Sequence, residues 1–175
     1  MAPAPDLWHQ DFEGDLEGWF RDFWRRSTSG LVFHNVNVSD RENWKHNFRV
    51  PDLVLVLPHQ REILCDTHIL GAPAVVVEIR SPGDESYEKL PFYAALGVPE
   101  VWIIDRDSKV PEVYVLTGDQ YEQAAPSEGG WLASKAAGVE FKSTANAKFG
   151  IRLAGKEASY RELPSREGPP ETRRL

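Results

Sequence analysis

The run of apolar residues at positions 74–80, AVVVEIR, constrains the fold more than any other feature of the sequence. An unbroken apolar run of this length is typical of a central strand that is covered on both faces. The run nevertheless carries Glu78, and ionised carboxylates are almost never buried alone because removing their charge from water is costly. Either a metal ion or an ion pair with Arg80 or Lys89 would allow a glutamate here.

The N-terminal part of the chain predicts one helix followed by two strands. Residues 7–26 place aromatic and aliphatic side chains at spacings of three and four, which indicates an amphipathic helix whose apolar stripe belongs to the core. Residues 31–38 and 48–57 have the apolar pattern of strands. Because Pro51 has no backbone donor, we expect an irregular or edge segment before the apolar part of the second strand.

The chain after the central strand predicts another helix and several more strands. The helix is expected to run from Glu88 to Leu96, with Pro91 in its first turn and Gly97 as its C-terminal stop. Further strands are predicted at residues 100–105, 112–116, 139–143 and 148–153. This order of elements indicates an α/β fold with a mixed, partly antiparallel sheet.

The sequence predicts a single domain. It covers residues 7–154, and the tail at 163–175, which is rich in proline, glycine and charge, is expected to be disordered. No apolar run approaches the roughly 20 residues that span a bilayer, and no signal peptide is recognised, so no membrane is expected. Cys65 is the one cysteine, which suits the reducing cytoplasm. The net charge of −7 argues against an evenly basic nucleic-acid binder but leaves room for a local basic patch.

Three residues have positions that suit catalysis. Asp52 begins one apolar strand, Glu78 lies near the end of another, and Lys89 begins the helix that follows. If the two strands are neighbours, the carboxylates would repel each other unless a cation neutralises them, and such oxygen ligands suit Mg²⁺ or Mn²⁺. The alternatives are a carboxylate at a strand edge for Asp52, an ion pair for Glu78, and a solvated helix face for Lys89.

These residues resemble the PD-(D/E)xK nuclease superfamily. The segments VPDLVLV and GAPAVVVEIRSPGDESYEKLPFYAALGVPEVWIID, with the following VYVL, are similar to the Uma-type restriction endonuclease family over residues 8–153. The resemblance implies a restriction-endonuclease-like core in which Asp52, Glu78 and the backbone carbonyl of Ile79 bind Mg²⁺ or Mn²⁺. It also implies that the catalytic lysine has moved to Lys89. Arg80 stands at the usual lysine position, where it supplies charge but is a poor base because it stays protonated.

The chain departs from the family pattern at two places. The family has an N-terminal hairpin with a further glutamate ahead of a helix that begins near a histidine, and His9 corresponds to that helix start. No hairpin is recognised before it, so Glu13 and Glu17 are candidates to replace its glutamate. Pro91 is the second departure, because a proline in the helix is expected to shift Lys89 relative to the carboxylates.

Two functions follow from these observations. The first is a metal-dependent endonuclease that hydrolyses phosphodiester bonds of nucleic acid, with DNA as the expected substrate and a homodimer implied by the resemblance. The alternative is a catalytically inactive interaction module that kept the fold, which the net charge and the two departures favour. If a duplex is bound, basic side chains are expected to line the cleft above the two carboxylates. The candidates are Arg25, Arg26, Lys45, Arg49 and Arg61.

Overall fold

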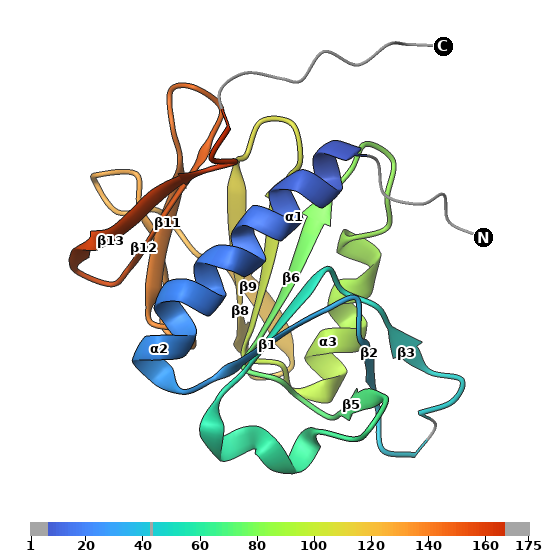
Figure 1. Cartoon of the computed structure of the whole chain (residues 1–175). Helices are drawn as coiled ribbons and strands as arrows, with labels where there is room; N and C mark the ends of the chain where they lie inside the picture. Colours follow the sequence, from blue (N-terminus) through green and yellow to red (C-terminus); the bar gives the residue numbers. More distant parts are fainter. Residues whose placement is uncertain (1–6, 43, 167–175) are drawn as a thin grey trace.

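A computed structural model of the chain describes residues 7–42 and 44–166, and its main sheet has six strands. In spatial order the strands are β1 (Leu31–His34), β4 (Leu53–Val56), β6 (Val75–Arg80), β7 (Glu100–Asp105), β8 (Pro111–Thr117) and β9 (Gln120–Gln123). The central pair β6 and β7 is parallel, and the other neighbouring pairs are antiparallel. The mixed α/β fold predicted from the sequence is therefore confirmed (Figure 1).

Two smaller sheets and several helical segments surround the main sheet. The second sheet contains β10 (Leu132–Ser134), β11 (Val139–Ser143), β12 (Phe149–Leu153) and β13 (Lys156–Leu163), and the small sheet contains β2 (Asn37–Ser39), β3 (Phe48–Arg49) and β5 (His68–Leu70). The helical segments are α1 (Leu7–Trp19), the π-helical η1 (Phe20–Trp24), α2 (Arg25–Thr28), the 3₁₀ segments η2 (Pro58–Ile63) and η3 (Tyr87–Lys89), and α3 (Leu90–Leu96).

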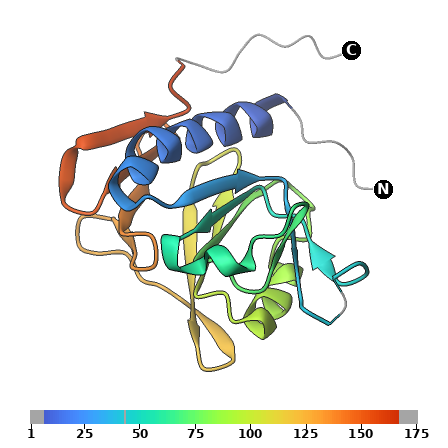
Figure 2. The same ribbon diagram turned by 60° about the horizontal axis from the view of Figure 1, so that its bottom comes forward.

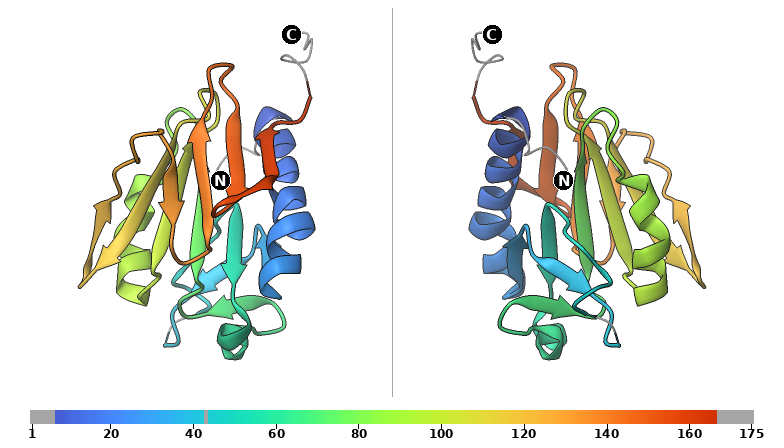
Figure 3. Two further views of the ribbon diagram at one scale, coloured as in Figure 1. Left: turned by 90° about the vertical axis from the view of Figure 1, so that its left-hand side faces the viewer. Right: turned by 90° about the vertical axis from the view of Figure 1, so that its right-hand side faces the viewer.

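The side chains of β6 point alternately to the two faces of the main sheet, and each face packs against a different layer. Val75, Val77 and Ile79 pack in one core with residues of α1 and the second sheet. Val76 faces the opposite way and packs with α3 in another core. Because successive side chains of a strand point to opposite faces, Glu78 lies on the same side as Val76, toward α3. The two helices accordingly lie on opposite sides of the main sheet (Figure 3), and the predicted double coverage of this strand is correct.

The N-terminal helical segment is held to the second sheet by its tryptophans. The indole N–H of Trp19 donates to the backbone carbonyl of Ser159 at 2.9 Å, and that of Trp24 donates to the carbonyl of Ala137 at 2.8 Å. Both tryptophans are buried, as the apolar stripe predicted. The helical segment ends at Thr28, where Ser29 adopts a left-handed conformation, and Gly30 then passes so close to the Trp24 ring that a Cβ at this position would overlap it.

Two predicted strands are each divided between sheets. Residues 31–38 form β1 and β2 in different sheets, because Asn35 has a positive φ of 49° that interrupts the extended chain. Residues 48–57 likewise form β3 and β4, with the break at Pro51 that its missing donor predicted. Strands β5, β10 and β13 were not predicted, because their residues carry little apolar alternation of their own.

The second sheet extends one strand beyond residue 154, where the sequence suggested that the domain ends. In β13, Leu163 is buried, and the nearby Arg166 binds the carboxylate of Asp11 at 2.6 Å. The rest of the predicted disordered tail, residues 167–175, lies outside the described residues. Among residues 7–42 and 44–166, none of the helices combines the length and apolar character needed to cross a membrane.

Candidate active site

The pairing of β4 with β6 brings Asp52 and Glu78 together. Leu53 pairs with Val77 in the antiparallel register, so one step further along each strand places Asp52 beside Glu78. The Asp52 side chain is fixed by the backbone N–H of Ile79, which donates to its Oδ2 at 2.5 Å. The adjacency of the two carboxylates that the sequence suggested is present, while their role as metal ligands, together with the Ile79 carbonyl, stays a prediction.

Helix α1 places two further polar residues, His9 and Glu13, beside Asp52. The Nε2 atom of His9 lies 2.8 Å from Asp52 Oδ1 and 3.8 Å from Glu13 Oε2. The Asn35 side-chain amide donates to Glu13 Oε1 at 2.9 Å. One potential ligand atom from each of His9, Glu13 and Asp52 lies within 4.8 Å of the others, a spacing that suits one metal ion. Of the two glutamates considered as substitutes, Glu13 lies at this cluster, whereas Glu17 binds Arg21 at 2.5 Å.

Glu78 is held by two side chains from the segment that follows it. The Lys89 ammonium lies 2.6 Å from Oε2, and the Tyr93 hydroxyl donates to Oε1 at 2.7 Å. Burial raises the pKa of Glu78 to about 7, and Lys89 opposes this rise. Burial and the Glu78 charge raise the pKa of Tyr93, so its hydroxyl keeps its proton and acts as a donor. The ion pair considered as an alternative is thus present, and it is made with Lys89.

Negative charge exceeds positive charge at this end of the sheet. Three carboxylates, those of Glu13, Asp52 and Glu78, lie near the ammonium of Lys89 and the imidazole of His9. Burial raises the pKa of Glu13, and the nearby charge of Asp52 raises it further. A divalent cation would remove this repulsion and favour the ionised form of each carboxyl group.

The loop after β6 sets the position of Lys89. The Asp84 carboxylate accepts hydrogen bonds from the backbone N–H groups of Ser81 at 2.6 Å and Ser86 at 3.0 Å, which closes the loop. Lys89 then ends a short 3₁₀ segment, and Pro91 lies in the first turn of α3, where a proline costs no helical hydrogen bond. Pro91 therefore leaves Lys89 within reach of Glu78, contrary to the displacement expected from the sequence.

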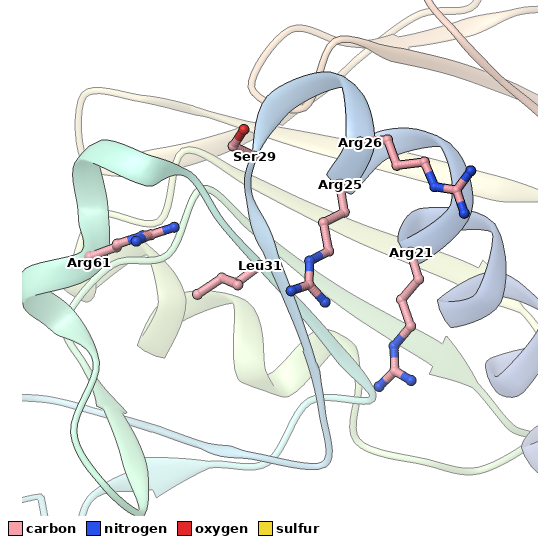
Figure 4. A pocket seen from close by; sticks show the side chains of 6 residues that line it. All are labelled: Arg21, Arg25, Arg26, Ser29, Leu31 and Arg61. Atoms are coloured by element: carbon pink, nitrogen blue, oxygen red, sulfur yellow. The ribbon is translucent and has the colours of Figure 1, made fainter.

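The predicted basic residues are not gathered on the carboxylates. Arg80 binds Asp105 at 2.8 Å. Arg49 lies over the ring of Phe92, and Lys45 lies over the ring of Trp44. The other three candidates line a separate concavity together with Arg21 (Figure 4); they are Arg25, Arg26 and Arg61. The expectation that the five residues line one cleft above Asp52 and Glu78 is therefore wrong.

Two residues of the site were missed at the sequence level. The sequence indicates His9 only as a helix start, although its spacing of four residues from Glu13 puts both side chains on one helix face. Tyr93 lies four residues after Lys89 and meets the same carboxylate. The spacing of four was therefore a usable signal in both cases, but the carboxylates that the pairs face come from other parts of the chain.

Comparison with known proteins supports the family resemblance seen in the sequence. The profile of the Uma2 family, described as "Putative restriction endonuclease", matches residues 1–147. The crystal structure of a putative nuclease belonging to DUF820 from Anabaena variabilis is similar, with a TM-score of 0.59 and 16% identity over 77% of this chain and 76% of that chain. At this identity the likeness concerns the fold alone, and none of the curated proteins matches the chain. Since the family profile spans most of the sequence, the chain belongs to the Uma2 family and has a restriction-endonuclease-like fold.

Proposed function

We propose that this protein is a metal-dependent endonuclease that hydrolyses phosphodiester bonds of nucleic acid, with DNA as the expected substrate. The observation that carries the proposal is the cluster of His9, Glu13 and Asp52, whose ligand atoms lie within 4.8 Å of one another. The Glu78–Lys89 pair beside Asp52 supports it, because a lysine next to acidic ligands suits phosphodiester hydrolysis.

The donor set fits a divalent cation. Carboxylate oxygens suit Mg²⁺ and Mn²⁺, whereas imidazole nitrogen suits softer first-row metals. A site with Asp52, Glu13 and His9 would therefore favour Mn²⁺ over Mg²⁺. Glu78 and the backbone carbonyl of Ile79 remain candidate ligands. When bound, the ion would polarise a phosphoryl oxygen and lower the pKa of a water molecule.

The chain's own residues would divide the remaining tasks. Lys89 has a side chain that is 24% exposed, so its ammonium can contact a phosphate while it stays paired with Glu78. Tyr93 would be a positioning residue, since it holds the other oxygen of Glu78. Arg80 is occupied by Asp105, and its proposed contribution is positive charge near the substrate.

The alternative is a catalytically inactive interaction module. It is favoured by the internal pairing of Glu78 with Lys89 and of Asp52 with His9, since each carboxylate already has a cationic or polar partner. A module of this kind would fold in the same way without holding a metal.

Titration with Mn²⁺ separates the two functions. The nuclease proposal expects measurable heat on Mn²⁺ binding and a rise in Tm, because a ligand that binds only the folded state stabilises it. Asp52→Asn should abolish both, whereas Asp119→Asn, in the exposed turn between β8 and β9, should change neither. Cleavage of plasmid DNA, single-stranded DNA and RNA is measured in the same three proteins. Asp52→Asn should abolish it, and Asp119→Asn should leave it unchanged. Absence of Mn²⁺ binding and of cleavage in the unaltered protein would favour the inactive module.

We also propose a cytoplasmic location and a homodimer. The location is supported by Cys65, which is exposed and free. The homodimer is supported by the family resemblance, since two sites are needed to cut both strands of a duplex. Light scattering that gives a mass near the 19.8 kDa of one chain would contradict the dimer.

A further inference from the structure

An arginine-lined cavity of about 540 Å³ lies where the N-terminal helical segment meets β1 and η2. Its lining residues are Arg21, Arg25, Arg26, Ser29, Leu31 and Arg61. Arg61 comes from a distant part of the chain, and Figure 4 shows it pointing toward Leu31 from the side opposite Arg25. Four guanidinium groups in one concavity repel each other, which is unusual in a chain with a net charge of −7.

Only part of this positive charge is neutralised within the protein. Arg21 binds Glu17 at 2.5 Å, and Arg26 lies 3.9 Å from Asp22. Arg25 and Arg61 make no ion pair or side-chain hydrogen bond with any residue in the described ranges 7–42 and 44–166. Their guanidinium groups are therefore available to an external anion, and the planar donors of arginine match the oxygen atoms of phosphate.

Two elements connect this cavity to the candidate active site. Along α1 and the start of η1, pairs four residues apart lead from His9 and Glu13 to Glu17 and Arg21. Arg21 is eight helical positions after Glu13, which corresponds to about 12 Å. Strand β1 runs beside this segment (Figure 2), with Leu31 lining the cavity at one end and Asn35, bound to Glu13, just beyond the other. Four extended residues give about the same span, roughly 13 Å.

We infer that the arginine cavity binds a backbone phosphate of the nucleic-acid substrate that lies a few nucleotides away from the bond to be cut. Phosphates of one strand advance by about 3.4 Å each along the duplex axis and also rotate around it, so a straight span of this length corresponds to roughly two to four nucleotides. The inference rests on the proposed nuclease function. It explains why the basic residues lie apart from Asp52 and Glu78: they would hold the flanking backbone and leave the carboxylates accessible.

The test measures binding without catalysis. A fluorescently labelled DNA duplex of about 20 base pairs is titrated in EDTA at several salt concentrations between about 50 and 200 mM. Arg25→Ala with Arg61→Ala should weaken binding about tenfold or more and reduce the slope of log K against log salt by close to two, one for each lost phosphate contact. Replacing both arginines with lysine should restore most of the slope. Lys135→Ala with Lys156→Ala removes the same charge from exposed positions outside the cavity and should leave the slope unchanged.

The outcomes separate this inference from the proposed function. An unchanged slope in the double alanine variant with unchanged Tm would overturn the cavity as a backbone site, even if the protein cuts DNA. Binding of inorganic phosphate to the unaltered protein, measured by calorimetry, without binding of the duplex would also overturn it. Arginine-dependent duplex binding by a protein that neither binds Mn²⁺ nor cleaves DNA would support the cavity and contradict only the nuclease.

Discussion

Glu78 shows how one buried carboxyl group is held between two opposing effects. Its side chain is almost fully buried, which favours the neutral form, while the Lys89 ammonium and the Tyr93 hydroxyl favour the ionised form. Burial is the larger effect, so the pKa is raised to about 7. At neutral pH this residue can therefore gain or lose a proton with little change in free energy, and a nearby cation would shift the balance toward the ionised form.

The raised pKa of Glu78 predicts a specific dependence of stability on pH. Between its ordinary value of 4.5 and about 7, the folded state binds more protons than the unfolded state, so the free energy of unfolding falls as pH rises. The Glu78 contribution is fully present below pH 4.5 and is lost once the pH passes about 7. The loss is on the order of 3 kcal/mol. Glu78→Gln should remove it.

Urea denaturation in EDTA at about pH 5 and about pH 8 measures this difference. The fall in stability should be markedly smaller in Glu78→Gln than in the unaltered protein. Glu122→Gln, which changes an exposed residue of β9, is the matched control and should keep the full fall. An equal fall in all three proteins would show that Glu78 titrates near its ordinary value.

At the scale of elements, Glu100 joins the main sheet to the second sheet. This residue begins β7 and is 3% exposed, yet its carboxylate accepts four hydrogen bonds. The donors are the indole of Trp102 at 3.2 Å, the hydroxyl of Ser134 at 2.5 Å, and the backbone N–H groups of Lys135 at 2.9 Å and Ala136 at 3.0 Å. Three of the donors lie in or just after β10, so one side chain fixes the position of that strand.

Removing this carboxylate is expected to destabilise the fold. Glu100→Ala leaves two buried donors, the Trp102 indole and the Ser134 hydroxyl, and two part-buried backbone N–H groups without this acceptor, and each buried donor costs about 1–3 kcal/mol. We expect a total loss of about 3 kcal/mol or more in the free energy of unfolding, measured by chemical denaturation. Glu122→Ala should change stability by less than about 0.5 kcal/mol. A Glu100→Ala protein as stable as this control would mean that water replaces the lost acceptor.

At the scale of the whole molecule, β13 completes the second sheet, which packs against one face of the main sheet. It pairs with β12 along the edge of the second sheet, and its Ser159 carbonyl accepts the hydrogen bond from Trp19 of α1. The buried Leu163 belongs to the same core as Trp19 and the apolar side chains of β6. The helix that carries His9 and Glu13 therefore depends on a strand near the other end of the described chain.

Truncation tests this dependence. A chain that ends at residue 154 lacks β13 and should lose its cooperative thermal unfolding transition, because α1 loses part of the surface on which it packs. A chain that ends at Arg166 keeps all the described contacts of β13 and should retain a Tm within a few degrees of the full chain. Circular dichroism during heating measures both. Equal transitions in the two truncated proteins would show that the fold is complete at residue 154.

Local patterns in the sequence identified most of the main sheet and part of the site. The valine run indicated a covered central strand, and the positions of Asp52 and Glu78 on two apolar strands indicated that they would meet if those strands were neighbours, which the pairing of β4 with β6 makes them. The Gly97 stop and the first-turn position of Pro91 were correct, although α3 begins at Leu90 and Glu88 lies in the preceding 3₁₀ segment. These predictions succeeded because burial of a strand or helix leaves a regular apolar pattern along the chain itself.

The tertiary structure decided which distant residues share a site. It brought His9 to Asp52 across 43 positions, divided residues 31–38 between two sheets, and placed Arg61 opposite Arg25 around one cavity. The sequence alone determined that Glu78 is buried and needs a partner; only the fold determined that the partners are Lys89 and Tyr93. The physical reason is that an apolar period reports which face of an element is buried, whereas the identity of the covering side chains depends on how all the elements pack together.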